Sequence, residues 1–273
     1  MNALVARGLE FRYRPDEPVL RGVDLELQPG ELLGIIGPNG GGKTTLLNLL
    51  AATIAPTAGS IELFGRPASA YTSRERARLA AMVPQETAVA FAFRVEEIVL
   101  MGRAPHLGRW RFEGRADLAA AREALELTGI ADLAGRRFHE LSGGERQRAM
   151  IAKALAQESR LLLLDEPTAF LDLRRQVEIY ELIRGLAAER GLAVLAVSHD
   201  INLAALFCDR LAVLCGGRIE AAGPPEEVLQ AERLSRVYGV RVELAAHPER
   251  PGAPLVFPLP GRRPRRDSPG GGA

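Results

Sequence analysis

The sequence lacks most of what would cross-link the chain, hold it in a bilayer or bind it to nucleic acid. Among its 273 residues are one tryptophan and two cysteines, Cys208 and Cys215. We interpret these cysteines as small buried hydrophobic residues in a reducing compartment, not as a disulfide or a metal pair. No apolar run approaches the roughly 18 residues that a membrane-spanning helix requires. The first residues include Arg7 and no apolar leader, so no secretory signal is expected.

A charge excess of one sign is also missing. Lys plus Arg (35) nearly equals Asp plus Glu (34), which leaves a formal net charge of +1. A protein whose main task is to bind nucleic acid phosphates normally carries a basic excess, so nucleic acid is not an expected partner. What remains is the composition of a soluble globular protein, 47% hydrophobic and 25% charged. Its length allows one large domain or two modest ones.

The hydrophobic pattern divides the chain into two strand-containing regions around a helical one. In the first region we expect strands at 3–13, 19–27, 32–37 and 59–65, a brief strand ending at 83–85, and helices at 43–52 and 71–79. Residues 86 to about 157 have helical spacing and no convincing strand. The second region predicts strands at 160–167, 192–200 and 210–219, with helices at 173–189 and 200–207 between them. Continuous apolar strands separated by helices indicate a parallel sheet covered on both faces.

After Gly223 we expect two short helices, at about 225–230 and 232–238, and a small hairpin formed by VRVEL and PLVFP. The last residues are rich in Pro, Gly and Arg and offer nothing to pack, so they are expected to be disordered. The overall organisation predicted from the sequence is a phosphate-loop α/β core interrupted by an all-helical insert.

The segment GPNGGGKTT, residues 37–45, has the G-x-x-x-x-G-K-[ST] spacing of a phosphate-binding loop between an expected strand and an expected helix. Its backbone N–H groups would surround phosphates. Lys43 would reach the β- and γ-phosphates, and Thr44 would hold Mg²⁺ through its hydroxyl. A flexible glycine turn is the alternative. The candidate nucleotide-binding residues here are Gly37, Pro38, Asn39, Gly40, Gly41, Gly42, Lys43, Thr44 and Thr45.

Acidic and polar side chains follow the apolar strands, at the edge where open α/β sheets bind ligands. Asp165 is suited to hold Mg²⁺, and Glu166 to polarise the water that attacks the γ-phosphate. His199 ends another strand at the same edge and is expected to contact the γ-phosphate, with a structural histidine as the alternative. Gln85 lies where the core gives way to the insert. We expect it to sense Mg²⁺ or the attacking water, although a polar residue at a junction often has no function.

A second phosphate-binding pattern, LSGGERQR, occupies residues 141–148. A serine and two glycines open an expected helix, where free N–H groups and the positive end of the helix dipole favour phosphate. This pattern has no lysine, and the chain already carries a more complete loop at 37–45.

The ordered set of the loop, Gln85, Leu141–Glu145, Leu161–Glu166 and His199 resembles the nucleotide-binding subunit of an ATP-binding-cassette (ABC) transporter over about residues 3–240. The resemblance implies an α/β fold, a P-loop NTPase core of ABC ATPase type with an N-terminal antiparallel β subdomain and an all-helical insert. The implied parts are an ATPase core (1–85 and 158–240), a helical subdomain with the signature (86–157), a small C-terminal extension (241–260) and the disordered tail (261–273).

The same resemblance explains the second pattern. It implies that Ser142, Gly143 and Gly144 reach the γ-phosphate held by the loop of a second copy. Two chains would then close head-to-tail around two shared sites, with ATP and Mg²⁺ as the cofactors. One chain carries one cassette and would be half of a homodimer.

Other positions match or depart from the family pattern. Tyr13 is placed where an aromatic stacks on adenine, with a packed strand aromatic as the alternative, and Asp172 lies in the loop that aligns the two sites. Gly41 stands where Ser or Ala is commoner, and Glu145 where Gln is frequent. Phe170 replaces the usual small residue, which is expected to alter communication between the sites.

The segment RVEEIVLMGRAPHLGRW, residues 94–110, resembles cassettes of importers for iron siderophores, haem and cobalamin. The implied partners are a polytopic permease dimer that docks near this segment and, indirectly, a periplasmic substrate-binding protein. The implied location is peripheral, on the cytoplasmic face of the bacterial inner membrane. Arg103, His106 and Arg109 are docking residues or a solvated basic face. The alternative functions are a cassette of another ABC importer or exporter, or a soluble ABC ATPase without a permease.

Overall fold

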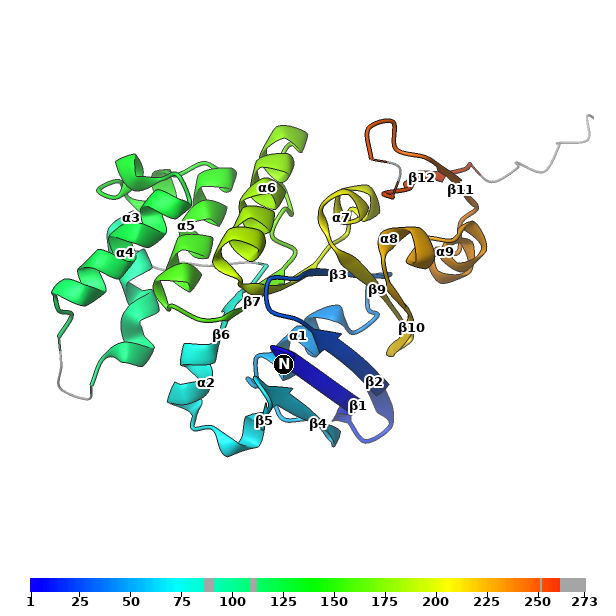
Figure 1. Cartoon of the computed structure of the whole chain (residues 1–273), viewed down its shortest axis with the longest axis horizontal. Helices are drawn as coiled ribbons and strands as arrows, with labels where there is room; N and C mark the ends of the chain where they lie inside the picture. Colours follow the sequence, from blue (N-terminus) through cyan, green and yellow to red (C-terminus); the bar gives the residue numbers. More distant parts are fainter. Residues whose placement is uncertain (86–90, 109–111, 251, 261–273) are drawn as a thin grey trace, which may run out of the picture.

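The structure, a computed structural model, describes residues 1–85, 91–108, 112–250 and 252–260. A four-stranded antiparallel sheet with the order β2-β1-β4-β5 comes from the first 70 residues and lies at the bottom of Figure 1. The long strands alternate buried and exposed side chains over part of their length, as expected for a sheet with one covered face. Its strands are β1 (Leu4–Arg14), β2 (Glu17–Leu27), β4 (Ala58–Leu63) and β5 (Arg66–Pro67).

The main sheet has six strands in the order β10-β9-β3-β8-β7-β6, and all neighbouring pairs are parallel except β10 with β9. Every residue of the three central strands β3, β7 and β8 is buried, which is why these strands are continuous apolar runs in the sequence. The strands are β3 (Leu32–Ile36), β6 (Ala80–Val83), β7 (Leu161–Asp165), β8 (Ala193–Val197), β9 (Arg210–Cys215) and β10 (Arg218–Gly223).

Two hydrophobic clusters cover the two faces of the main sheet. Alternate side chains of β3 enter different clusters: Leu33 and Ile35 face the cluster shared with the antiparallel sheet, and Leu32 and Ile36 face the cluster shared with most of the other helices. Helix α1 (Lys43–Leu50) fills the space between the two sheets. The expected parallel sheet covered on both faces is therefore confirmed.

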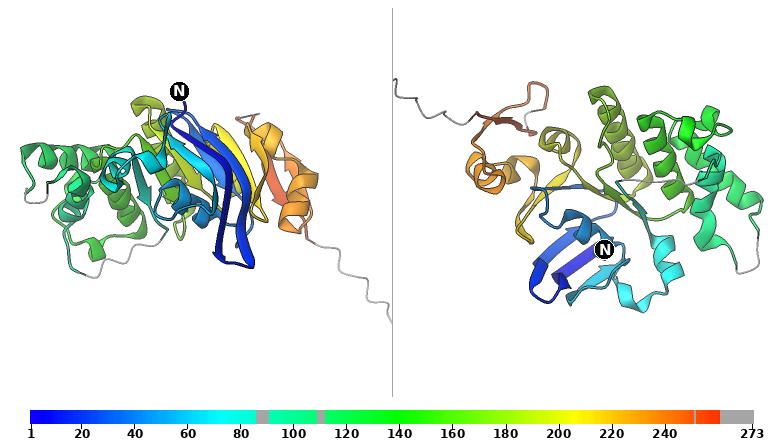
Figure 2. Two further views of the ribbon diagram at one scale, coloured as in Figure 1. Left: turned by 90° about the horizontal axis from the view of Figure 1, so that it is seen from below. Right: turned by 180° about the vertical axis from the view of Figure 1, so that it is seen from behind.

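The region after β6 is helical, as predicted: the described residues 91–108 and 112–157 contain no strand, only an isolated bridge between Arg94 and Arg137. These helices lie to the left in Figure 1, and the views of Figure 2 keep them at one end of the molecule. The elements are α3 (Val95–Leu100), the 3₁₀ helix η2 (Met101–His106), α4 (Arg115–Leu127), the short turns η3 (Ala131–Leu133) and η4 (Phe138–Glu140), and α5 (Gly143–Ala156).

Along the chain, the remaining helices connect the strands of the main sheet or follow its last strand. The C-terminal helices and hairpin lie at the other end of the molecule from α3 and α4 (Figure 1), and the predicted hairpin is present. The tail that we expected to be disordered, 261–273, falls outside the described residues. The elements are η1 (Ala68–Ala70), α2 (Ser73–Leu79), α6 (Leu173–Arg190), α7 (Ile201–Phe207), α8 (Pro225–Val228), α9 (Ala231–Tyr238), β11 (Val242–Ala245) and β12 (Leu255–Pro258).

The prediction of a single strand at 210–219 is wrong. The segment forms a hairpin, β9 followed by β10, in which Cys215 pairs with Arg218 across a two-residue turn. Gly216 and Gly217 both have positive φ values, 54° and 77°, as a tight hairpin turn requires. The glycine pair was the available sequence signal, and the apolar run on each side of it concealed the turn.

Two absences inferred from the sequence can be checked in the structure. Both cysteines are free; Cys208 is buried, and its burial raises the pKa of the thiol, whereas Cys215 is half-buried. Within the described ranges, every helix is too short or too polar to cross a bilayer.

Candidate functional site

The phosphate-binding pattern forms the turn between β3 and α1. Gly37 has a φ of 150°, and a Cβ atom there would lie 2.0 Å from the Leu214 carbonyl oxygen, so no larger residue fits. Gly42 caps α1 with a φ of 95°, a left-handed conformation that a side chain disfavours. Both positions therefore require glycine, one because of close packing and the other because of its positive φ. The loop that they shape leads into the N-terminus of α1, where backbone N–H groups and the positive end of the helix dipole favour phosphate.

Lys43 lies at the start of α1 and is held inside the loop. Its Nζ donates hydrogen bonds to the carbonyl oxygens of Gly37 at 2.9 Å and Pro38 at 3.0 Å, and the residue is only 6% exposed. Burial lowers the pKa of Lys43, while the nearby carboxylates of Glu166 and Asp165 act in the opposite direction. The ammonium group therefore lies inside the loop and faces two acidic groups.

Asp165 ends β7 beside the loop and is buried. The Thr44 hydroxyl donates to Asp165 Oδ1 at 3.4 Å. Burial raises the pKa of Asp165, and the Thr44 hydrogen bond opposes this shift. One hydroxyl and one carboxylate are hard oxygen donors of the kind that Mg²⁺ takes together with phosphate oxygens and water. Among the described residues no group of three acidic, histidine or cysteine side chains could hold a metal alone.

Glu166 receives a contact from each neighbouring strand end. Gln85, after β6, donates from Nε2 to Glu166 Oε2 at 2.6 Å, and His199, after β8, contacts Glu166 Oε1 through Nε2. Glu166 has a positive φ of 51°, an uncommon backbone conformation for a residue other than glycine. Strain of this kind concentrates at functional sites. Three residues singled out from the sequence thus meet at one carboxylate.

These groups line one cavity. Its volume is about 410 Å³, and its lining includes the loop residues Gly42, Lys43 and Thr44 as well as Glu166 and His199. A neighbouring cavity of about 510 Å³ shares Gln85, Glu166 and His199 and extends to Phe170. The sequence-predicted loop and the three strand-end residues therefore surround a continuous region at the carboxyl edge of the sheet.

The turn that carries His199 has a support that the sequence reasoning missed. Tyr180 of α6, fully buried, donates from its hydroxyl to Ser198 Oγ at 2.8 Å, and Ser198 Oγ donates to the Asp200 carbonyl oxygen at 3.0 Å. Asp200 then caps α7 by accepting a hydrogen bond from the Leu203 N–H. A serine immediately before histidine and aspartate was visible in the sequence, but its tyrosine partner was not.

Tyr13 lies beside the cavity on the last part of β1. Its side chain is 64% exposed, its hydroxyl lies 3.4 Å from Thr45 Oγ1, and its ring meets Phe11 edge-on. An exposed ring does not fit the alternative of a packed strand aromatic. The ring is available for stacking next to the loop that would hold the phosphates.

The second phosphate pattern caps the helix that carries it. Ser142 is the N-cap of α5: its hydroxyl accepts from the Glu145 N–H at 3.4 Å, and Glu145 Oε2 accepts from the Ser142 N–H at 2.7 Å. Hydrogen bonds from the Ser142 hydroxyl and the Ser142 N–H to the Glu145 carboxylate lower the pKa of Glu145. In the described part of the chain, the residues that line the loop cavity include neither Ser142 nor the two glycines that follow it. The chain therefore does not bring its two phosphate patterns together.

The segment between Glu166 and α6 lies next to this second pattern. A Cβ atom on Gly143 would lie 3.3 Å from Leu171 Cδ2. Asp172 is the N-cap of α6 and accepts from the Arg175 N–H at 2.9 Å. Phe170 has a positive φ of 61°, and its ring is 89% exposed.

The surface position predicted for Arg103 is wrong. Arg103 is 5% exposed, and the residues that neutralise it lie within the chain, so it is neither a solvated basic residue nor an exposed docking residue. His106 is half-buried and lies 2.9 Å from the Gln157 carbonyl oxygen. Arg109 falls outside the described residues.

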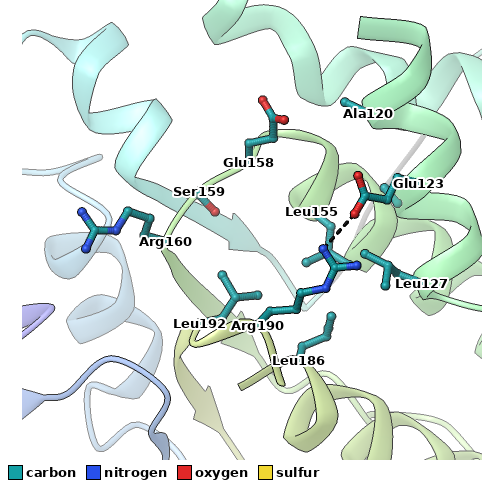
Figure 3. Close-up of a pocket in the computed structure, with 11 residues that line it drawn as sticks. Ala120, Glu123, Leu127, Leu155, Glu158, Ser159, Arg160, Leu186, Arg190 and Leu192 are labelled. Atoms are coloured by element: carbon teal, nitrogen blue, oxygen red, sulfur yellow. Dashed lines mark hydrogen bonds and ion pairs between the residues drawn. The ribbon is translucent and has the colours of Figure 1, made fainter. Parts of the chain in front are cut away.

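A separate cavity of about 270 Å³ lies at the amino ends of β7 and β8, at the opposite edge of the sheet from the loop (Figure 3). An ion pair between Arg190 Nη1 and Glu123 Oε1, 2.8 Å long, crosses it. Leucines from α4, α5 and α6 line its apolar part. Of its ionic groups, Arg190 and Glu123 are paired with each other and Glu158 is paired with Arg103, and the cavity shares no lining residue with the loop cavity.

Comparison with known proteins gives a consistent result. A family model described as ABC transporter matches residues 20–169. The hemin import ATP-binding protein HmuV of Streptomyces coelicolor is 50% identical over 241 residues, which are 88% of this chain and 85% of that protein. A metal-chelate type ABC transporter in an inward-facing conformation is similar in structure, with a TM-score of 0.82, 31% identity and coverage of 95% of this chain and 98% of that one.

A dimeric ATP-binding cassette solved in a post-hydrolysis state with ADP and Pi also resembles the chain. The TM-score is 0.70 and the identity 27%, over 81% of this chain and 97% of that one.

Proposed function

The chain belongs to the ABC transporter family, and from this membership we propose that it is the ATP-hydrolysing motor subunit of a haem importer. The observation that carries the proposal is the meeting of Lys43, Asp165, Glu166 and His199 at one edge of the sheet. The 50% identity to a hemin import ATP-binding protein supports the cargo.

In this proposal the loop binds the phosphates of ATP. The N–H groups of Asn39–Thr45 and the positive end of α1 supply fixed donors, and Lys43 supplies the charge. The exposed ring of Tyr13 stacks on the base. Because Lys43 already lies in the loop beside Asp165 and Glu166, the site is organised by the chain itself.

Glu166 is assigned the role of general base. A carboxylate at this strand end orients and deprotonates the attacking water. Gln85 and His199 contact its two carboxylate oxygens and so fix its orientation. The buried tyrosine hydroxyl of Tyr180 holds the turn that carries His199. Mg²⁺, when bound, neutralises charge on the phosphates, and Thr44 and Asp165 would hold it, with Gln85 nearby.

A second copy completes each site. Ser142 caps α5, and Gly143 and Gly144 form its first turn, where backbone N–H groups have no partner within the helix; all three residues lie outside the chain's own loop cavity. The dimeric state of a related cassette supports their use by a partner copy, closed head-to-tail. Closure drives transport because contacts to the γ-phosphate exist in only one of the two states.

The proposed assembly adds a membrane permease dimer on the cytoplasmic side of the membrane, and a periplasmic substrate-binding protein that delivers the cargo without contacting this chain. This chain then binds the membrane only through the permease. The helical part formed by α3, α4 and α5 provides the docking surface in this proposal.

The test is reconstitution. The chain is purified with its permease from native membranes and placed in lipid vesicles with ATP in the compartment that the cassettes face. Haem, a ferric siderophore or cobalamin is added on the other side together with the substrate-binding protein. We expect ATP-dependent haem uptake. Uptake of cobalamin or siderophore instead would overturn the haem assignment and leave the motor function intact. ATP hydrolysis without transport of any of the three would overturn the importer assignment.

A further inference from the structure

We propose that Arg103 is a positioning residue for ATP hydrolysis: it fixes the C-terminal end of α5 to the core and thereby sets where Ser142 meets the nucleotide of a second copy. The inference rests on the shared sites proposed above. It concerns a buried cluster, which we call the α5 clasp and define as Gly102, Arg103, Pro105 and His106 of η2 with their partners.

Arg103 joins three segments of the chain. Its Nε donates to Asp117 Oδ1 in α4 at 3.0 Å, and its Nη1 donates to the carbonyl oxygen of Ala156, the last residue of α5, at 2.7 Å. Nη1 also donates to Glu158 Oε2 at 2.6 Å. Glu158 adopts a positive φ of 53°, an uncommon conformation that places its carboxylate on the arginine. A planar guanidinium can serve these divergent acceptors at once, and a lysine cannot.

His106 and Gln157 extend the clasp to the core. The His106 ring lies 2.9 Å from the carbonyl oxygen of Gln157, the C-cap of α5. Side chains of η2 therefore contact the carbonyl oxygens of both Ala156 and Gln157 at this end of the helix. Helix ends leave such carbonyl groups without partners inside the helix, and basic side chains are favourable there. Gln157 Nε2 in turn donates to the carbonyl oxygens of Ala77 in α2 and Ala80 in β6.

The same turn is fixed from the opposite side. The Pro105 carbonyl oxygen accepts from Arg74 Nε at 2.7 Å and from Arg78 Nε at 3.0 Å, both in α2. Gly102 packs so closely that a Cβ atom would lie 2.1 Å from the Lys153 carbonyl oxygen of α5. The clasp therefore binds α5 to α4 and, through two independent routes, to the core helix α2.

The length of α5 connects the clasp at its C-terminal end to Ser142 at its N-terminal end. The helix has 14 residues, which span about 21 Å. A rotation of about 10° around the clasp would move the first residue of α5 by about 4 Å. Contacts in a catalytic site tolerate displacements of only about 0.5 Å. Ser142 and the glycines at the far end thus depend on the clasp for their position, although Arg103 lies at the end of α5 farthest from them.

The experiment compares Arg103→Met and Arg103→Lys with Arg115→Met, a control at an exposed arginine of the same helical part. Four quantities are measured: the ATP affinity of the monomer, kcat and KM for hydrolysis, and ATP-dependent dimerisation in a Glu166→Gln background. We expect Arg103→Met to lower kcat and weaken dimerisation by about tenfold or more. ATP affinity and KM should change by less than about twofold, because each chain's own loop is untouched. Arg103→Lys should recover only part of the loss.

A spectroscopic readout separates positioning from general stability. Spin labels are attached at Ser69→Cys in the core and Asp132→Cys in the helical part, both exposed, in a Cys215→Ser background with the buried Cys208 retained. We expect one narrow distance between the labels in the parent protein. Arg103→Met should broaden or shift that distance, and the Arg115→Met control should not.

Unchanged label distances and unchanged kcat in folded Arg103→Met would overturn the proposal. If that variant does not fold, Glu158→Gln removes one ion pair at a carboxylate that is 59% exposed, and it should give a smaller loss in the same direction. No change in that variant would also overturn the proposal. If the Glu166→Gln parent does not dimerise with ATP, the shared-site function fails, while the label distances still decide whether the clasp positions the helical part.

Discussion

Replacement of Ser142 by alanine should remove two properties of this residue, and the chain contains a control that separates them. Ser142 caps α5, and in the proposed dimer its hydroxyl also meets the γ-phosphate of the second copy. Thr72 caps α2 in the same way, with a glutamate three residues later that completes the reciprocal pair of hydrogen bonds. Thr72 has no place in the nucleotide site. The two alanine variants therefore share the loss of a cap and differ in the loss of a phosphate contact.

The structure sets the size of each effect. The Ser142 hydroxyl accepts at 3.4 Å and the Thr72 hydroxyl at 3.2 Å, so both caps are long, similar hydrogen bonds. Loss of a cap of this kind costs about 1 kcal/mol, which lowers Tm by about 2–4 °C in a domain of this size. A hydrogen bond to a charged group is worth about 1.5–3 kcal/mol, and its loss from the transition state would slow hydrolysis about 10- to 150-fold.

The assay measures thermal unfolding and steady-state phosphate release at saturating ATP for the parent, Ser142→Ala and Thr72→Ala. We expect equal small decreases in Tm for both variants. Only Ser142→Ala should lose most of its hydrolysis, and Thr72→Ala should stay within about twofold of the parent. Equal hydrolysis by the two variants would refute the reasoning, because Ser142 would then be a helix cap and nothing more.

Three other predictions concern the carboxylates and the exposed ring. Glu166→Gln should bind ATP and form a stable dimer, but it should release ADP at least about 100-fold more slowly than the parent. Glu181→Gln, a control at an exposed glutamate, should not be slowed. Turnover of Glu166→Gln near that of the parent would exclude Glu166 as the base. Phe170→Ala should weaken that dimer in light scattering, whereas Phe112→Ala, with a ring also 89% exposed, should not; equal dimerisation contradicts an interface role. Because burial raises the pKa of Asp165, its contribution to stability is present below the unfolded value of 3.8 and lost as pH rises through the higher folded value. Asp165→Asn should therefore raise the free energy of unfolding of the nucleotide-free protein at pH 7, with a gain that vanishes toward pH 3.8 in urea titrations; a gain independent of pH would contradict this origin.

The central part of the fold followed from the sequence because it is encoded locally. Buried parallel strands require continuous apolar runs, and such runs are visible without knowledge of their neighbours. The glycine loop is local in the same sense, since Gly37 and Gly42 are required by their own backbone conformations and close packing. The strand ends then place Asp165, Glu166 and His199 at one edge by topology alone.

What the sequence did not reveal depends on partners far along the chain. Arg103 was expected at the surface, but its environment is decided by Asp117, Ala156 and Glu158, which no spacing rule connects to it. The support of His199 by Tyr180 is of the same kind. The hairpin at 216–217 is different: its glycine pair was a local signal, and the apolar run around it was given too much weight. The positive φ of Phe170 could not have been inferred from its residue type.

The hairpin between β9 and β10 also links the two sheets. The Arg21 N–H in β2 donates to the Gly217 carbonyl oxygen at 2.9 Å, and a Cβ atom on Gly217 would lie 2.3 Å from the Val19 carbonyl oxygen. This contact ties the β1–β2 arm that carries Tyr13 to the strand next to β3. The arm that carries Tyr13 and the phosphate-binding loop therefore belong to one unit, and the distance between that ring and the loop is set by the two sheets and not by the helical part.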